Sequence, residues 1–191
     1  KKPLGCGAWS RLYGESGLVW IVVGIAAVGI MLVLIPVIGS MLPKVHTVSR
    51  VAYLNKSQHD IWRLITDIQG QTIWRSDLRN VTRLPDRNGR EVWIETDNRG
   101  QTRVLETMRF TPPRILVRQS VGLNEKFRYR WTYEVAEFGE VTSLAVTEES
   151  EIDSPGIRFV SRLLAGPSAT IEGYLRLVAE KCGVDVNIIN S

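Results

Sequence analysis

Two acidic residues, Glu95 and Glu106, have the type and spacing that could carry chemistry in this 191-residue chain. Each lies in a segment of alternating apolar and polar residues, which is typical of a strand with one buried face. Glu95 shares a side with Trp93, and Glu106 shares a side with Met108. We expect both acids to point inward, where an apolar setting raises the pKa of a carboxyl group. Such a group can act as a general acid or base, or can orient a ligand hydroxyl.

A structural role competes with catalysis at these positions, and for Glu106 we weight it above catalysis. A carboxylate on a sheet can pair with an arginine such as Arg118, or can simply face water. A register shift of one residue would also turn Glu106 away from the interior. Glu95 and Glu106 are therefore weak candidates for catalysis, and an enzyme is less favoured than a binding protein.

Other catalytic patterns are missing from the sequence. His46 and His59 are its two histidines, and neither has a catalytic partner nearby. Cys6 and Cys182 form no CxxC pair, so neither a disulfide framework nor a zinc site follows. No nucleophile triad, metal-ligand cluster or phosphate-binding glycine loop can be identified. We expect no metal and no cofactor.

Four aromatic residues are candidates for lining a ligand cavity: Trp74, Trp93, Tyr129 and Trp131. Aromatic side chains combine a large apolar surface with a polar tip, which suits them to stacking on a ligand. Packing in the core is the competing role and the commoner one. Tyr129 and Trp131 belong to 127–135, the clearest alternation in the chain, which predicts a strand with one buried face.

The charge of the chain argues against a nucleic acid partner. The formal net charge is +4, but Lys1, Lys2, Arg11 and Glu15 precede a long apolar segment. Removing these three basic residues and one acidic residue from totals of 24 and 20 leaves 21 basic and 19 acidic residues. The remainder is nearly neutral, with arginines interleaved among acids, whereas phosphate binding needs a concentrated basic patch.

The elements that position these side chains begin with a membrane span at 18–42, preceded by a short tail at 1–17. No charged residue occurs between positions 16 and 43. About 20 apolar helical residues cross a hydrocarbon core of about 30 Å, so this segment is long enough. A cleaved signal peptide is the competing interpretation, although its apolar region is usually shorter. We expect a single-pass protein of the cell membrane, with its N-terminus cytoplasmic and its domain on the opposite side.

A single α+β domain follows at 44–183, with a tail at 184–191. Strands are expected at Val45–Leu54 and then at 81–84, 91–96, 102–110, 115–121, 127–135 and 141–152. Ser57 followed by Asp60 predicts the start of a short helix with a buried stripe. The segment 157–182 has helical periodicity, and Pro167 marks a kink or a new start.

This order of elements resembles the START-like, or SRPBCC, superfamily, which includes polyketide cyclases and dehydrases. The resemblance covers residues 44–182 and depends on several short motifs. These are Val48-Ser49-Arg50-Val51, Ile61-Trp62, Thr66-Asp67, Trp74, Pro112-Pro113-Arg114-Ile115-Leu116-Val117, Tyr129-Arg130-Trp131 and Val141-Thr142. It implies a helix-grip fold, in which an antiparallel sheet of about seven strands wraps around a long C-terminal helix and encloses an apolar cavity.

The resemblance implies a cavity lined by strand residues and by the last helix. The expected ligand-binding residues are Trp74, Trp93, Glu106, Met108, Tyr129, Trp131, Leu163 and Ile171. The leading hypothesis is a membrane-anchored, noncatalytic module that holds a hydrophobic small molecule or lipid. The alternatives are a cyclase or dehydrase with an inward carboxylate, and an interaction protein whose cavity is filled by its own side chains. The sequence leaves the oligomeric state open.

Overall fold

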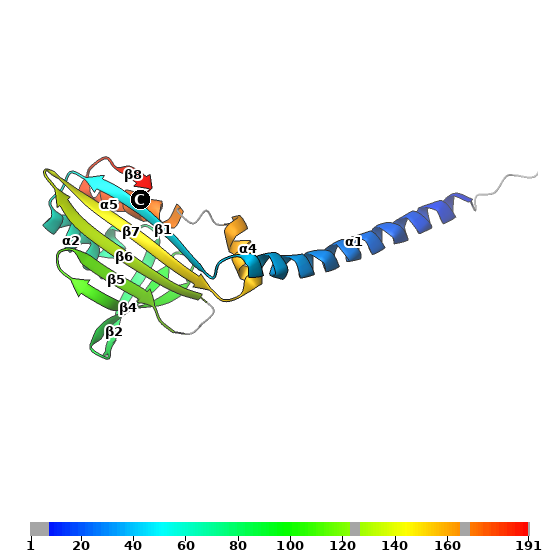
Figure 1. Ribbon diagram of the computed structural model, residues 1–191, viewed down its shortest axis with the longest axis horizontal. Helices are drawn as coiled ribbons and strands as arrows, with labels where there is room; N and C mark the ends of the chain where they lie inside the picture. The colour runs from blue at the N-terminus through cyan, green and yellow to red at the C-terminus, as the bar shows by residue number, and fades with distance from the viewer. Residues whose placement is uncertain (1–7, 123–126, 165–168, 191) are drawn as a thin grey trace, which may run out of the picture.

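The computed structural model describes residues 8–122, 127–164 and 169–190. Helix α1 (Ala8–Met41) projects as a rod from the domain that the following residues form (Figure 1). Within the described residues, one helical segment, Val19–Met41, is long and apolar enough to cross a membrane. Its 23 residues would extend about 34 Å at about 1.5 Å per residue, compared with about 30 Å of hydrocarbon.

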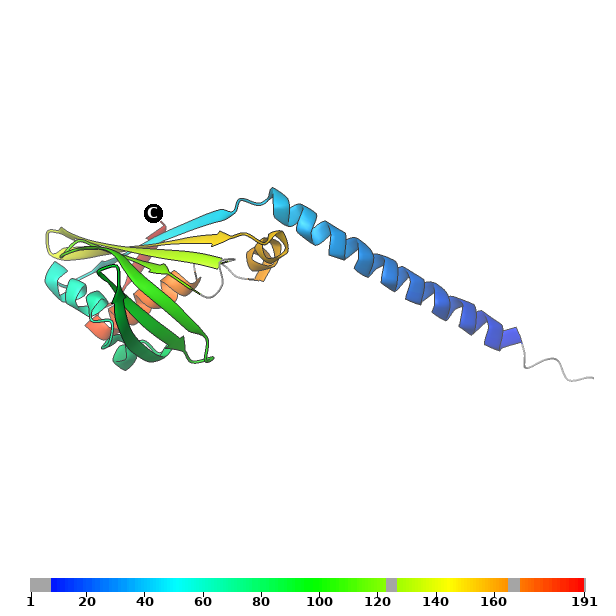
Figure 2. The ribbon, with the colours of Figure 1, turned by 90° about the horizontal axis from the view of Figure 1, so that it is seen from below.

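The described part of the domain is an antiparallel sheet of eight strands with helices on its inner side (Figure 2). The strand order is β2-β3-β4-β5-β6-β7-β1-β8. The strands are β1 (Val45–Leu54), β2 (Leu78–Arg87), β3 (Arg90–Asp97), β4 (Thr102–Thr111), β5 (Ile115–Ser120), β6 (Phe127–Phe138), β7 (Val141–Ile152) and β8 (Asn187–Asn190). The helices after α1 are α2 (Gln58–Thr66), α3 (Gln71–Trp74), α4 (Pro155–Leu164) and α5 (Ala169–Cys182).

Local sequence signals explain several of these elements. The backbone N–H of Asp60 donates a 3.1 Å hydrogen bond to the Ser57 hydroxyl, which confirms the expected start of α2. Asn88 and Gly89 adopt φ values of 53° and 75°, the left-handed conformation that a tight hairpin between β2 and β3 requires. The expected turn at this position is therefore confirmed.

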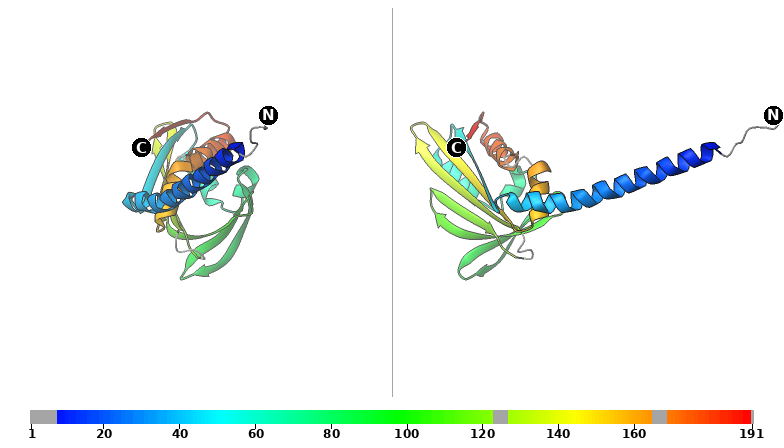
Figure 3. Two further views of the ribbon diagram at one scale, coloured as in Figure 1. Left: turned by 90° about the vertical axis from the view of Figure 1, so that its right-hand side faces the viewer. Right: turned by 45° about the vertical axis from the view of Figure 1, so that its right-hand side comes forward.

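The core lies between the inner face of the sheet and helices α2 and α5. Ile61 and Ile65 of α2 and Leu175 of α5 are buried against strand residues such as Leu144. Figure 3 shows the sheet curving around these helices, with α4 lying apart from them beside α1. This arrangement is the helix-grip architecture, in which the packed core occupies the α2 end of the inner face.

Three features differ from the sequence-based expectation. The described sheet has eight strands and not about seven, because 187–190, expected to belong to a tail, pair with β1. The final helical segment is two separate helices: α4 ends at Leu164, and α5 begins at Ala169. Pro167, the expected kink or restart, lies outside the described residues. Of these two helices, α5 packs in the core, whereas α4 packs against α1.

Candidate ligand-binding cavity

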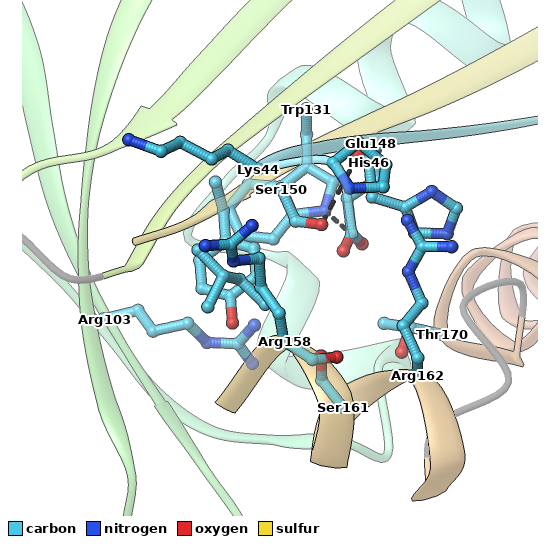
Figure 4. A pocket seen from close by; sticks show the side chains of 13 residues that line it. Lys44, His46, Arg103, Trp131, Glu148, Ser150, Arg158, Ser161, Arg162 and Thr170 are labelled. Atoms are coloured by element: carbon cyan, nitrogen blue, oxygen red, sulfur yellow. Dashed lines mark hydrogen bonds between the residues drawn. The ribbon is translucent and has the colours of Figure 1, made fainter. Parts of the chain in front are cut away.

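A cavity of about 270 Å³ opens at the end of the sheet where α1 joins β1. Its lining residues come from the link after α1, from β1, β4, β6 and β7, and from helices α4 and α5 (Figure 4). The strands therefore form one wall, and α4 with the start of α5 forms the other. Cavities that bind small molecules begin at roughly this size, at about 300 Å³.

Part of the strand wall of the cavity, on β6 and at the end of β7, is aromatic and apolar. Tyr129 and Trp131 stack with ring centroids 5.7 Å apart and an angle of 15° between their planes. Ile152 extends this wall on β7. The indole Nε1–H of Trp131 donates a 3.0 Å hydrogen bond to the Glu148 carboxylate, so the ring is held in place. A flat apolar surface of this kind suits contact with a hydrophobic ligand.

Four cationic side chains line the cavity together with one carboxylate among the described lining residues. The cations are Lys44, Arg103, Arg158 and Arg162, and the carboxylate is Glu148. Burial raises the pKa of Glu148, although the hydrogen bond from Trp131 and the charge of Arg103 oppose that shift. The lining is therefore net positive.

Two of the polar groups in the lining are incompletely satisfied. Arg158 is 7% exposed, and its Nη1 donates to the backbone oxygen of Leu42, but its buried Nε has no hydrogen-bond partner. The buried Nε2 of His46 also has no partner. Burial lowers the pKa of His46, and the charge of Arg162 lowers it further. Unsatisfied buried polar groups are costly unless water or another group pairs with them.

A second, smaller cavity of about 50 Å³ lies deeper and shares Arg103, Trp131 and Thr170 with the first. Its floor is an ion cluster. Arg118 Nη1 lies 2.5 Å from a Glu95 carboxylate oxygen, and Arg75 lies 3.7 Å from the other oxygen of Glu95. The Nε and Nη2 of Arg118 are buried without partners.

Aromatic residues enclose this ion cluster. Tyr133 and Tyr174 meet at 5.6 Å, and Trp74 packs on Tyr174 at 6.1 Å. The guanidinium of Arg75 lies 5.4 Å from the centre of the Tyr174 ring. Burial raises the pKa of both tyrosines, so their hydroxyl groups stay protonated in the neutral pH range. These rings leave little free space at the inner end of the cavity.

The structure brings together four of the residues expected at the site. Tyr129 and Trp131 line the outer cavity, while Glu95, Ile171 and again Trp131 line the inner one. Trp74 contributes indirectly, through its packing on Tyr174. Alternation along β3 and β6 was a sufficient signal for the strand residues, since neither strand has a bulge before these positions.

The other expected residues lie elsewhere. Glu106 pairs across the sheet with Gln119 and is on the face opposite Glu95, where its carboxylate lies 3.1 Å from Nη1 of Arg90. Met108 lies 3.8 Å from the same nitrogen. A register shift between 107 and 109 marks a bulge here, which breaks the alternation expected to continue to position 110.

Trp93 and Leu163 are also outside both cavities. Trp93 is buried in a small separate cluster with Ile68, Leu78 and Val81. Leu163 is 73% exposed on α4. The spacing that placed Leu163 on an inner helix face assumed that α4 and α5 form one helix, but α4 packs against α1 whereas α5 packs in the core.

The charged residues of the site were missed by the sequence reasoning. Arg158 and Arg162 are four residues apart on α4, so they lie on one face of that helix, and this spacing was a readable signal. Glu148 is two and four residues from the inward-facing Val146 and Leu144, so alternation could have found it. The sequence predicts Arg118 as a partner of Glu106, whereas the structure pairs it with Glu95.

Comparison with solved structures shows the same fold in several other proteins. The chain superposes on the di-domain ARO/CYC StfQ of the steffimycin biosynthetic pathway with a TM-score of 0.59, at 14% identity over 73% of this chain. The Zhui aromatase/cyclase from Streptomyces sp. R1128 gives 0.60 at 13% identity, covering 73% of this chain and 94% of that one. A START superfamily protein from Mycobacterium smegmatis gives 0.53 at 17% identity, covering 71% and 96%.

These likenesses show that the chain shares the α+β helix-grip fold of these proteins. The chain spans 53% of StfQ and 60% of a second di-domain ARO/CYC, BexL. No protein-family model matches the chain, and no curated protein matches its sequence. At identities of 17% or less in these three superpositions, the fold is shared and the ligand remains to be inferred from the site.

Proposed function

We propose that this protein is a membrane-anchored binding module that holds a hydrophobic small molecule or lipid in the cavity beside α4. The observation that carries the proposal is the cavity of about 270 Å³, which has the Tyr129 and Trp131 rings on one wall. Burying apolar ligand surface against such a wall contributes about 0.8 kcal/mol per methylene group.

The position of the cavity supports an anchored module. Pro43 and Lys44, directly after the apolar helix, are part of its lining. A signal sequence would have the same length and composition as Val19–Met41. However, α4 packs against the last turns of α1, with the carbonyl oxygen of Pro155 directly over Gly39, which supports retention of α1 as an anchor.

The exposed apolar face of α4 also supports attachment to a bilayer. Ile157, Val160 and Leu163 are 37%, 41% and 73% exposed and recur at three-residue steps. Because α4 packs beside the end of α1, this face lies at the level where a membrane surface would be. Helices with an apolar face and basic residues on the other face bind that interface.

The two alternatives fit the site less well. The cyclase or dehydrase expected from the sequence would use Glu95 or Glu106 as an inward carboxylate without a cationic partner, but Glu95 is paired with both Arg118 and Arg75. Glu106 is paired with Arg90 on the other face. Glu148 is the carboxylate that lines the outer cavity among the described residues, and its hydrogen bond from Trp131 gives it a role in holding that ring. An interaction protein with a filled cavity would have a sealed interior, which the outer cavity argues against.

Native mass spectrometry of the full chain purified in detergent tests the proposal, followed by extraction and identification of bound molecules. We expect a stoichiometric apolar adduct. Ser161→Trp, which places an indole in the cavity, should abolish the adduct, because Ser161 lines the α4 wall. Glu180→Trp, at an exposed position of α5, is the matched control and should retain it.

A chain without any adduct that also fails to take up a panel of lipids and isoprenoids would contradict the proposal. Equal retention of the adduct in both tryptophan variants would place the ligand outside this cavity.

A further inference from the structure

The outer cavity has an excess of positive charge that its own residues do not neutralise. Among its described lining residues, Glu148 is the one carboxylate that faces Arg103, Arg158 and Arg162. Figure 4 shows the three arginines entering the cavity, Arg103 from β4 and Arg158 and Arg162 from α4. The guanidinium of Arg103 lies 6.0 Å from the centre of the Trp131 ring, on the strand wall, whereas the other two belong to the α4 wall. A fourth cation, Lys44, instead forms an ion pair with Asp153 at 3.8 Å.

Arg158 is the most informative of these cations because its side chain is more than nine-tenths buried. Its printed hydrogen-bond acceptor is a backbone oxygen, that of Leu42, and its Nε–H has none. A buried guanidinium without a carboxylate partner is costly in an apolar setting. An oxyanion that accepts hydrogen bonds from Arg158 would remove this cost, since guanidinium groups match carboxylate and phosphate oxygens geometrically.

Resting on the function proposed above, we infer that the ligand is an anionic amphiphile, with a carboxylate or phosphate head group held by Arg158 and assisted by Arg103 and Arg162. The apolar part of the molecule lies along Tyr129, Trp131 and Ile152, which form the opposite wall. The unpartnered Nε2 of His46, at the same cavity, can donate to the head group when the ring carries its proton on that nitrogen.

The source of such an amphiphile is the bilayer. Arg158 and Arg162 lie on α4, whose other face exposes Ile157, Val160 and Leu163. The cations are thereby placed at the level of lipid head groups, and the cavity mouth opens beside the end of the membrane span. A free carboxylate or phosphate in solution would present the same oxyanion but would leave the apolar wall unused.

Equilibrium dialysis of the full chain in phosphatidylcholine nanodiscs tests this inference, with empty nanodiscs subtracted. Dodecanoate and dodecyl phosphate carry the head group, dodecanol has the same chain without the charge, and acetate and inorganic phosphate have the charge without the chain. We expect dodecanoate or dodecyl phosphate to bind at least about tenfold more tightly than dodecanol. Acetate and inorganic phosphate should not compete at equal concentration.

Two variants move the affinity in opposite directions. Arg158→Gln keeps a donor for the oxygen of Leu42 but removes the charge, and should weaken dodecanoate binding by about tenfold or more while changing dodecanol binding less than about twofold. Glu148→Gln keeps an acceptor for Trp131 and removes the opposing carboxylate, so it should strengthen dodecanoate binding by about threefold. Arg176→Gln, at an exposed position of α5 outside this cavity, is the charge-matched control.

The outcomes separate the inference from the proposed function. Equal binding of dodecanol and dodecanoate, or an equal loss of both in Arg158→Gln, would overturn the anionic head group and leave the hydrophobic cavity intact. Full competition by acetate or inorganic phosphate would overturn the bilayer-derived ligand. Failure of every chain-bearing probe would contradict the proposed function itself. If Arg158→Gln does not fold, Glu148→Gln decides, since a gain in affinity cannot come from misfolding.

Discussion

At the scale of single residues, charge is the unusual property of the interior. Glu95 and Arg118 are 4% and 3% exposed and form a close ion pair beneath the aromatic rings of Tyr133 and Tyr174. A buried ion pair of this kind adds little net stability compared with apolar residues, but removal of one partner leaves the other charge uncompensated. The pair therefore fixes the shape of the cavity floor more than it stabilises the domain.

Replacement of Glu95 by Gln should be strongly destabilising for this reason. We expect a loss of about 3 kcal/mol in the free energy of unfolding, measured by thermal or chemical denaturation of the full chain in detergent. Glu149→Gln breaks the exposed pair with Arg130, whose side chains are 42% and 49% exposed, and should cost less than about 1 kcal/mol. Similar losses for the two variants would show that Glu95 is not effectively buried.

The lowered pKa of His46 predicts a dependence of stability on pH. Its pKa in the folded protein lies below the ordinary value because burial disfavours the charged ring and Arg162 repels it. Between that lowered pKa and about 6.5, the unfolded chain binds a proton that the folded chain does not. The stability contribution is therefore complete above about pH 6.5 and decreases as the pH falls through this window.

His46→Gln should reduce this decrease when melting temperatures at about pH 7.5 and about pH 5.5 are compared. The exposed His59 supplies the control, and His59→Gln should retain the pH dependence of the unmodified chain. An unchanged pH dependence in His46→Gln would indicate that another group titrates in this range.

At the scale of elements, the packing of α4 against the end of α1 positions the α4 wall of the cavity beside the link after α1. A Cβ atom added at Gly39 would lie 1.9 Å from the carbonyl oxygen of Pro155, so the two helices approach too closely there for any other residue. Gly29, one of the glycines in the exposed part of α1, has no atom within 4 Å of such a Cβ. The close approach of α4 therefore requires a glycine at position 39, whereas the space around position 29 would accommodate a side chain.

Gly39→Ala should separate α4 from α1, whereas Gly29→Ala should not. Overpacking of a close contact costs about 1–3 kcal/mol, and we expect faster amide hydrogen exchange across 155–164 in Gly39→Ala. Exchange in Gly29→Ala should match that of the unmodified chain. Identical exchange in both variants would contradict the close contact between the helices.

The elements also show what the sequence could and could not predict. The alternation in 127–135, the cap at Ser57 and the Asn88-Gly89 turn are local signals, and each predicted its element. The bulge near Met108 and the pairing of 187–190 with β1 depend on neighbouring strands, which a single sequence does not reveal. The face of the sheet occupied by Glu106, and the faces occupied by the residues after the bulge, therefore could not be predicted from the sequence alone.

At the scale of the whole molecule, the apolar helix α1 and the α+β domain that begins at β1 are joined end to end (Figure 1). The basic residues before the apolar segment predict a cytoplasmic N-terminus, with the domain on the opposite side of the membrane. Protease added to intact cells should then degrade an epitope tag at the C-terminus and spare one at the N-terminus. The reverse pattern would place the domain in the cytoplasm.

The short link between α1 and the domain would limit how the protein exchanges its ligand. Only a short link around Pro43 separates α1 from β1, and Arg158 binds the oxygen of Leu42 across that link. If α1 anchors the protein as proposed, the domain cannot swing on a long tether or reach a second membrane, and it would not act as a shuttle. Under the proposed function, it would meet its ligands by two-dimensional diffusion within one leaflet, and its occupancy would follow their surface density there.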